Sequence, residues 1–109
     1  MISETLVKQF LIFLYRQHVE EYGESISKLP DAGFHVLENV FVDEHPEAVV
    51  ALNDDTYKKL TFNLAKELNV RGFAEVDALV VTLTPNGYEE ARRLSHPAKY
   101  FLHNHLHKP

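Results

Sequence analysis

The stretch LAKELNVRGFAEVDALVVTLTPNGYEEARRL, residues Leu64 to Leu94, decides the fold. It begins with the end of a helix and turns at Arg71-Gly72. Two β-rich runs follow, at 73–76 and 79–83, and Asp77-Ala78 is a minimal turn between them. This order predicts a two-stranded antiparallel hairpin joined to helices, which places the chain in the α+β class.

A helix is predicted on each side of the hairpin. Thr84-Pro85 is an N-cap followed by proline at the first helical position, so we expect a helix at 85–94. Before the hairpin, Asn53 and the two aspartates after it can cap a helix at 54–68. The inward residues of that helix recur at three- and four-residue steps: Tyr57, Leu60, Thr61, Leu64, Ala65 and Leu68.

The run LTPNGYEEARRL resembles the junction between the last strand and the following helix in winged helix-turn-helix transcription regulators, in the broad sense that includes the MarR and PadR groups. The matching positions are Leu83, Thr84, Gly87, Tyr88, Ala91 and Leu94. The preceding LAKELNVRGFAEV is similar, more loosely, to the exit of the recognition helix in those families, through Leu64, Leu68, Gly72, Phe73 and Val76. The resemblance covers residues 54–94 and implies that the 54–68 helix is the recognition helix and the hairpin is the wing.

The chain departs from the family pattern in two places. The turn of the hairpin is very short and carries an acid, Asp77. The segment expected to hold the second helix, 33–52, is longer and less regular than usual. Within it, 33–42 fits either a strand or a helix, and we favour a helix, followed by a short helix from Pro46 to Leu52.

Helices are also expected towards both ends of the chain. Ser3 caps a helix at 3–22 that ends before Gly23, and its apolar stripe is wide enough to be central to the core or shared with a partner subunit. A last helix or tail is expected at 98–107. We predict a homodimer through the first helix and this C-terminal segment, because two-fold pairing matches palindromic operators.

Composition limits the class of protein. A length of 109 residues predicts a single domain, and the absence of cysteine excludes disulfides and thiolate ligands and fits a reducing cytoplasm. The N-terminus lacks the basic region of a signal peptide, and the apolar run Phe10 to Tyr15 is far shorter than the about 20 residues of a membrane span. We therefore expect a cytoplasmic protein without a membrane segment.

The charge is acidic overall and uneven along the chain. The formal net charge is −5. Residues 1–53 hold three basic and nine acidic residues, a balance of −6, whereas residues 54–109 hold eight and seven, a balance of +1. A nucleic-acid surface is thus expected in the second half, although the strongly basic composition typical of nucleic-acid-binding domains is absent.

The predicted DNA-binding residues lie on or just after the 54–68 helix: Lys58, Lys59, Asn63, Lys66 and Arg71. Lysine and arginine neutralise phosphates, and asparagine can read adenine in the major groove. The alternative is an ordinary solvated helix face, because Asp54, Asp55 and Glu67 reduce the balance over 54–71 to +1.

Other site chemistries are not favoured. His103, His105 and His107 are spaced for imidazole ligation, but no carboxylate or cysteine accompanies them, so we expect a polar tail and no metal or cofactor. No nucleophile, second shell or oxyanion hole accompanies the acids and histidine at 43–45, so we expect no catalytic residues and no enzyme. The sequence predicts a DNA-binding transcriptional regulator acting on double-stranded DNA; the alternative is a winged-helix protein–protein interaction module without DNA binding.

Overall fold

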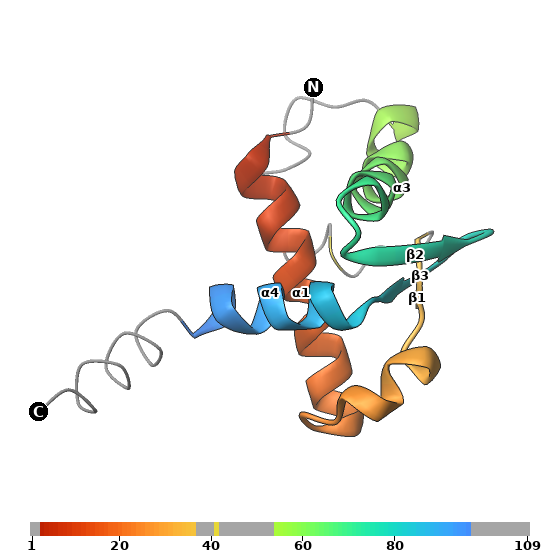
Figure 1. The fold of residues 1–109 in the computed structure, drawn as a ribbon. Helices are drawn as coiled ribbons and strands as arrows, with labels where there is room; N and C mark the ends of the chain where they lie inside the picture. The colour runs from red at the N-terminus through yellow and green to blue at the C-terminus, as the bar shows by residue number, and fades with distance from the viewer. Residues whose placement is uncertain (1–2, 37–40, 42–53, 97–109) are drawn as a thin grey trace, which may run out of the picture.

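The computed structural model describes residues 3–36, 41 and 54–96. Their elements, in chain order, are α1 (Glu4–Tyr22), the 3-10 helix η1 (Ile26–Asp31), β1 (Phe34–His35), α3 (Asp54–Val70), β2 (Ala74–Asp77), β3 (Val80–Leu83) and α4 (Pro85–Ser95) (Figure 1). In this part of the chain, three α-helices pack with a small antiparallel sheet that has one buried and one exposed side. The α+β class predicted from the sequence is confirmed.

The described sheet has three strands, in the order β1-β3-β2, so the expected two-stranded sheet is wrong. Phe34 pairs with Val81 and His35 with Val80. The helix expected at 33–42 is therefore wrong at its start, although Phe41 has helical backbone and the other residues from 37 to 42 lie outside the described part. A strand of two residues is too short to show an alternating hydrophobic pattern. It forms because the backbone of β3 supplies its hydrogen-bond partners.

The hairpin turn lies one residue later than expected. Asp77 pairs directly with Val80, which leaves Ala78 and Leu79 as the two turn residues. Ala78 has a φ of 55°, in the left-handed region that tight two-residue hairpins require. Because register has a period of two, this pairing places Glu75 and Asp77 on the side of the sheet that faces away from the core.

α1 runs through the centre of the core. Its first turn is capped by Ser3, whose Oγ accepts a hydrogen bond from the Leu6 amide at 3.1 Å, and it ends at Gly23, which has a φ of 67°. Its buried residues are Val7, Phe10, Leu11, Phe13, Leu14, Tyr15 and His18. The wide apolar stripe predicted from the sequence therefore packs against other residues of the same chain.

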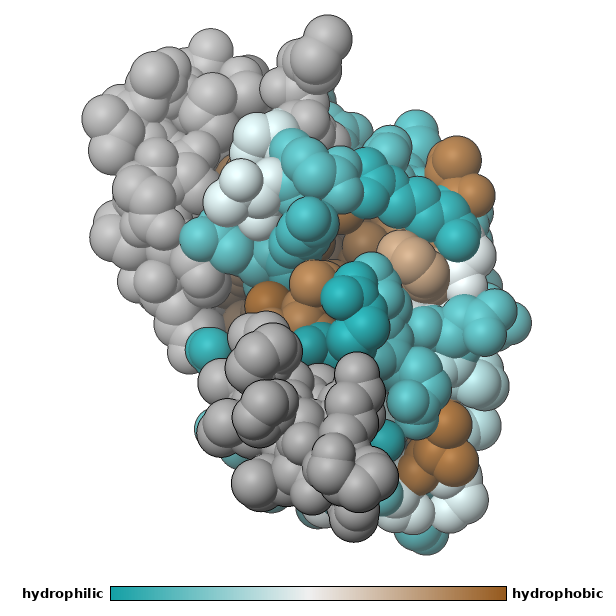
Figure 2. Space-filling view, turned by 60° about the vertical axis from the view of Figure 1, so that its left-hand side comes forward, coloured by the Kyte–Doolittle hydropathy of each residue, from teal (hydrophilic) through white to brown (hydrophobic). Residues whose placement is uncertain are grey.

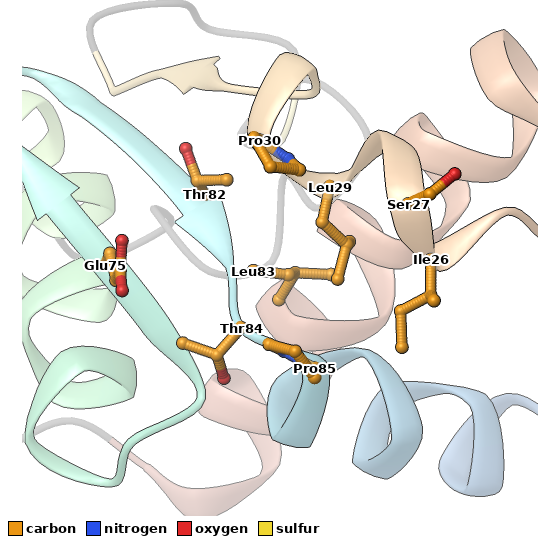
Figure 3. A pocket seen from close by; sticks show the side chains of 9 residues that line it. All are labelled: Ile26, Ser27, Leu29, Pro30, Glu75, Thr82, Leu83, Thr84 and Pro85. Carbon is orange, nitrogen blue, oxygen red and sulfur yellow. The ribbon is translucent and has the colours of Figure 1, made fainter.

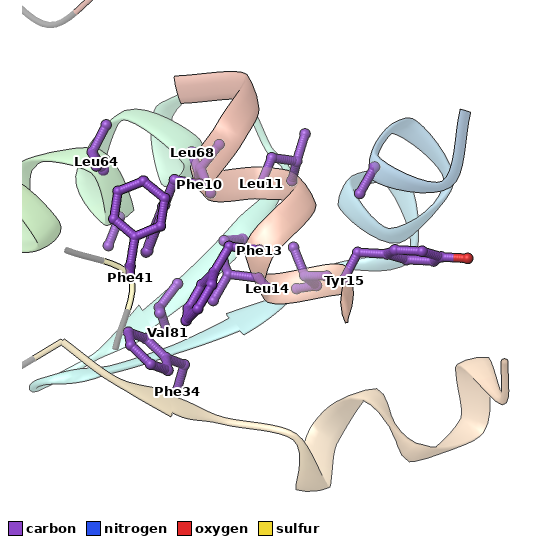
Figure 4. Close-up of a cluster of buried hydrophobic side chains, with 14 of the residues drawn as sticks. Phe10, Leu11, Phe13, Leu14, Tyr15, Phe34, Phe41, Leu64, Leu68 and Val81 are labelled. Carbon is purple, nitrogen blue, oxygen red and sulfur yellow. The ribbon is translucent and has the colours of Figure 1, made fainter. Parts of the chain in front are cut away.

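Aromatic packing joins α1 to the segments that follow it (Figure 4). The Phe10 and Phe13 rings lie edge-on to Phe41, at centroid distances of 5.1 and 5.3 Å. Phe34 lies edge-on to Phe13 at 5.1 Å. Such edge-to-face pairs add about 0.5–1.5 kcal/mol each to the burial of their rings.

The junction between β3 and α4 is held by Thr84. Its Oγ1 accepts a hydrogen bond from the Gly87 amide at 3.1 Å, and its hydroxyl donates to the Gly72 carbonyl at 2.7 Å. The Thr84 amide donates to the Phe73 carbonyl at 3.0 Å. The predicted N-cap is therefore confirmed, and it also ties the start of α4 to the turn before β2.

The remaining predicted segments, from Pro46 to Leu52 and at 98–107, lie outside the described residues. The homodimer stays a prediction. One half of its expected contact, 98–107, lies outside the described residues. The other half, the apolar stripe of α1, packs against residues of the same chain. None of the described helices is long and apolar enough to cross a membrane.

Candidate nucleic-acid interface

α3 presents a polar stripe opposite its buried face. Lys59, Asn63 and Lys66 are exposed, and their spacing of four and three residues places them on one side of the helix. The opposite side is fixed in the core by Leu60, Thr61, Leu64, Ala65 and Leu68. Burial of that side determines the direction in which the polar stripe points, as the sequence predicted for these three residues.

Lys66 is positioned by an aromatic neighbour. Its Nζ lies 5.4 Å from the centroid of the Phe62 ring, a cation–π contact worth about 0.5–1 kcal/mol at an exposed site. Phe62 itself is half-buried and packs against the core. This aromatic residue, which lies off the main apolar stripe, therefore supports a lysine of the exposed face.

The other two predicted cations, Lys58 and Arg71, are not part of this exposed stripe as the structure describes it. Lys58 belongs to α3, but its side chain lies outside the described part of the structure. Arg71 follows the helix and is engaged by two carboxylates. Its Nη1 and Nη2 donate to Glu4 at 2.7 and 2.6 Å, and its Nε donates to Glu67 at 3.1 Å.

The Arg71 ion pairs tie the start of α1 to the end of α3. The hydrogen bonds from Arg71 lower the pKa of the Glu4 carboxyl below its ordinary value, and those to Glu4 raise the pKa of the guanidinium. A phosphate would have to compete with both carboxylates for this group. The structure therefore brings together Lys59, Asn63 and Lys66 but directs Arg71 towards α1.

The hairpin beside α3 is acidic. Residues 73–83 contain Glu75 and Asp77 and no lysine or arginine. Both carboxylates are exposed. An acidic surface repels phosphate, so this hairpin lacks the charge that a wing in contact with DNA requires.

The arginines of α4 are paired along their own helix. Arg93 Nη2 lies 2.7 Å from Glu90, and Arg92 Nη1 lies 3.7 Å from Glu89. The Arg93 hydrogen bonds lower the pKa of Glu90. Both arginines lie in the last turn of α4, where a positive charge stabilises the helix dipole, and their ion pairs leave them less available to a phosphate.

A buried polar cluster lies between α1 and α4, and the sequence did not predict it. His18 is 2% exposed, and its Nε2 lies 2.8 Å from the Ser25 carbonyl, while its ring meets Tyr88 edge-on at 5.3 Å. The Tyr15 hydroxyl donates to Glu24 at 2.7 Å. Burial, and then this bond, raise the pKa of Tyr15. The available signal was the position of His18, four residues after Leu14 on the buried stripe of α1.

Within the described residues, no three histidine, cysteine, aspartate or glutamate side chains converge on a possible metal site, and the C-terminal histidines lie outside that part. Comparison with known proteins found no matching family model, no matching curated protein and no matching solved structure. The case for a function therefore depends on the residues themselves.

Proposed function

We propose that the chain is a small winged-helix transcription regulator that binds double-stranded DNA through α3. The order of a helix, an acidic hairpin and a capped helix across residues 54–95 supports the winged-helix assignment. The observation that carries the proposal is the exposed stripe of Lys59, Asn63 and Lys66. Two ammonium groups flank an amide on one helix face, which is the combination that contacts phosphates on either side of a base edge.

In this proposal the stripe supplies both parts of recognition. Lys59 and Lys66 neutralise phosphates, and the contact with Phe62 restricts the ammonium group of Lys66. Asn63 lies between them and can form a bidentate pair with adenine, worth about 1–3 kcal/mol of discrimination. The hairpin stays away from the phosphates because of Glu75 and Asp77.

The test is a titration of a labelled random duplex, followed by fluorescence anisotropy, at low and at physiological salt. We expect binding that weakens steeply with salt. Lys59→Gln combined with Lys66→Gln should weaken it further and reduce the salt slope by about 2, since each phosphate contact contributes about 0.9. Lys8→Gln combined with Lys28→Gln makes the same charge change on α1 and η1 and serves as the matched control, because both lysines are exposed.

Two results would contradict the proposal. One is the absence of binding at low salt, which would favour the protein–protein interaction module instead. The other is an equal loss of affinity in the two double variants, which would show that only net charge matters. Where binding is found, Asn63→Ala should reduce discrimination between selected and random duplexes while the salt slope is retained.

A further inference from the structure

A groove lies where the outward side of the sheet meets η1 and the start of α4 (Figure 3). Its volume is about 320 Å³, and it is lined mainly by apolar side chains, which include Ile26, Leu29, Pro30, Leu83 and Pro85. Ile26 is 45% exposed at its edge. In Figure 1, η1 and α3 lie on opposite sides of the strands, so this groove is separate from the proposed DNA-binding stripe.

Acidic groups continue from the groove along β2. Glu75 is the one charged residue among the described residues that line it. Asp77 stands two residues further on the same side of the strand, towards the hairpin turn. In the described part of the chain, neither carboxylate has an ion-pair or hydrogen-bond partner.

An exposed apolar residue stands at the far end of this surface. Val80 pairs directly with Asp77 across the hairpin, so both side chains point to the same side of the sheet, and Val80 is 37% exposed. Ile26 and Val80 are two of the four large apolar residues that the described surface exposes. The face shown in Figure 2 has a mainly hydrophilic described surface with small separate apolar patches.

We propose that this surface, defined by the groove, Glu75, Asp77 and Val80, binds an extended segment of a partner protein in which basic residues alternate along the chain and apolar residues flank them. The spacing of the two carboxylates supports an extended peptide as the ligand. Carboxylates at positions i and i+2 of a strand are about 6.5–7 Å apart, which is also the separation of alternate side chains in an extended peptide. Two lysines or arginines of such a segment can therefore meet both acids, while the flanking apolar side chains reach the groove and Val80.

The order of apolar and acidic groups along this surface determines the sequence of the peptide used as a probe. It is an acetylated and amidated heptapeptide with leucine at both ends, lysine at positions three and five, and threonine elsewhere. Its matched partner carries glutamate in place of both lysines. Titration into ¹⁵N-labelled protein, at low and physiological salt, should shift the amide signals of Glu75, Asp77 and Thr82 with the lysine peptide only.

Substitutions separate this surface from general acidity. Glu75→Lys combined with Asp77→Lys should weaken binding of the lysine peptide tenfold or more, because like charges then face each other. Glu20→Lys combined with Glu21→Lys makes the same change of net charge at two exposed positions of α1 and should weaken it far less. Ile26→Ser should weaken binding several-fold with no change in its salt dependence.

Three results would overturn the proposal: equal binding of the glutamate peptide, equal losses in the two charge-reversed variants, or shifts confined to other surfaces. Circular dichroism checks that each variant is folded. If Glu75→Lys combined with Asp77→Lys unfolds the chain, Glu75→Gln with Asp77→Asn provides the same test without charge reversal. The result does not depend on whether α3 binds DNA.

Discussion

Gly87 lies where the first turn of α4 passes the backbone of Phe73. A Cβ atom at this position would overlap the Phe73 carbonyl oxygen and lie 2.7 Å from its carbonyl carbon. That carbonyl is held in place by the Thr84 amide, and the Phe73 amide is held by Leu68. The glycine of the TPNG sequence is therefore required for close approach rather than for flexibility.

Gly87→Ala should accordingly destabilise the protein, although alanine normally favours a helix over glycine by about 1 kcal/mol. We expect a loss of about 3 kcal/mol, the upper part of the range for overpacking, in urea unfolding followed by circular dichroism. Asn86→Ala, at an exposed position of the same turn, is the control and should change stability by about 0.5 kcal/mol or less. A Gly87→Ala variant as stable as the control would show that α4 can move away from Phe73.

Ala78 gives the opposite prediction. Its φ of 55° costs an L-residue about 1–2 kcal/mol, which glycine avoids at the expense of about 0.5–1 kcal/mol of chain entropy. Ala78→Gly should therefore raise stability by about 0.5–1 kcal/mol in thermal unfolding. Ala32→Gly should lower it, because Ala32 has a φ of −103° and gains no relief. A decrease in both variants would contradict the strained turn.

At the scale of elements, the Arg71 ion pairs link α1 to α3, and their effect should depend on pH. The pKa of Glu4 is lowered in the folded protein, so its contribution to stability is present above the unfolded value near 4.5. That contribution is lost as the pH falls through the lower folded value. Glu4→Gln should thus be less stable than the wild type at neutral pH, and the difference should disappear in acid and shrink in high salt.

The measurement is urea unfolding of both proteins across this pH range. Glu20→Gln is the control, because Glu20 is exposed on the same helix and makes no ion pair with another described residue. A difference between Glu4→Gln and the wild type that persists at the lowest pH would show that the ion pair is not its cause.

The elements that could be predicted from the sequence are those specified by local signals. α4 follows from Thr84 and Pro85, and α1 follows from its Ser3 cap and its apolar periodicity. At 33–42 the local pattern fits a strand as well as the helix that we favoured, and it could not decide between them, because the two residues of β1 become a strand only through pairing with β3 far along the chain. The same distinction applies to the site: helical spacing predicted the exposed stripe of α3, whereas the engagement of Arg71 depends on Glu4 near the other end of the sequence.

At the scale of the whole molecule, one core serves both proposed surfaces. α1 packs against α3, β3 and α4, so the lysine stripe and the acidic sheet surface are positioned by the same buried side chains. The two surfaces differ in the sign of their exposed charges, with Lys59 and Lys66 on α3 and Glu75 and Asp77 on the outward side of the sheet. Net charge alone cannot report this arrangement, because it averages over both surfaces.

Because these elements share one hydrophobic core, they should unfold together. Phe13 contacts Phe10, Phe34 and Phe41, so Phe13→Ala should lower the free energy of unfolding by about 3–5 kcal/mol, and Phe13→Leu by far less. Circular dichroism reports the helices. The chain has no tryptophan, so its five tyrosines give the fluorescence signal, and Tyr22→Phe, Tyr57→Phe and Tyr100→Phe in every protein compared leave only the buried Tyr15 and Tyr88 of the α1–α4 contact. In urea the two transitions should coincide in the wild type and in both variants, with midpoints in the order of the substitutions. Separate transitions would mean that α4 unfolds independently of the phenylalanine cluster, and the two surfaces would then not be held by a common core.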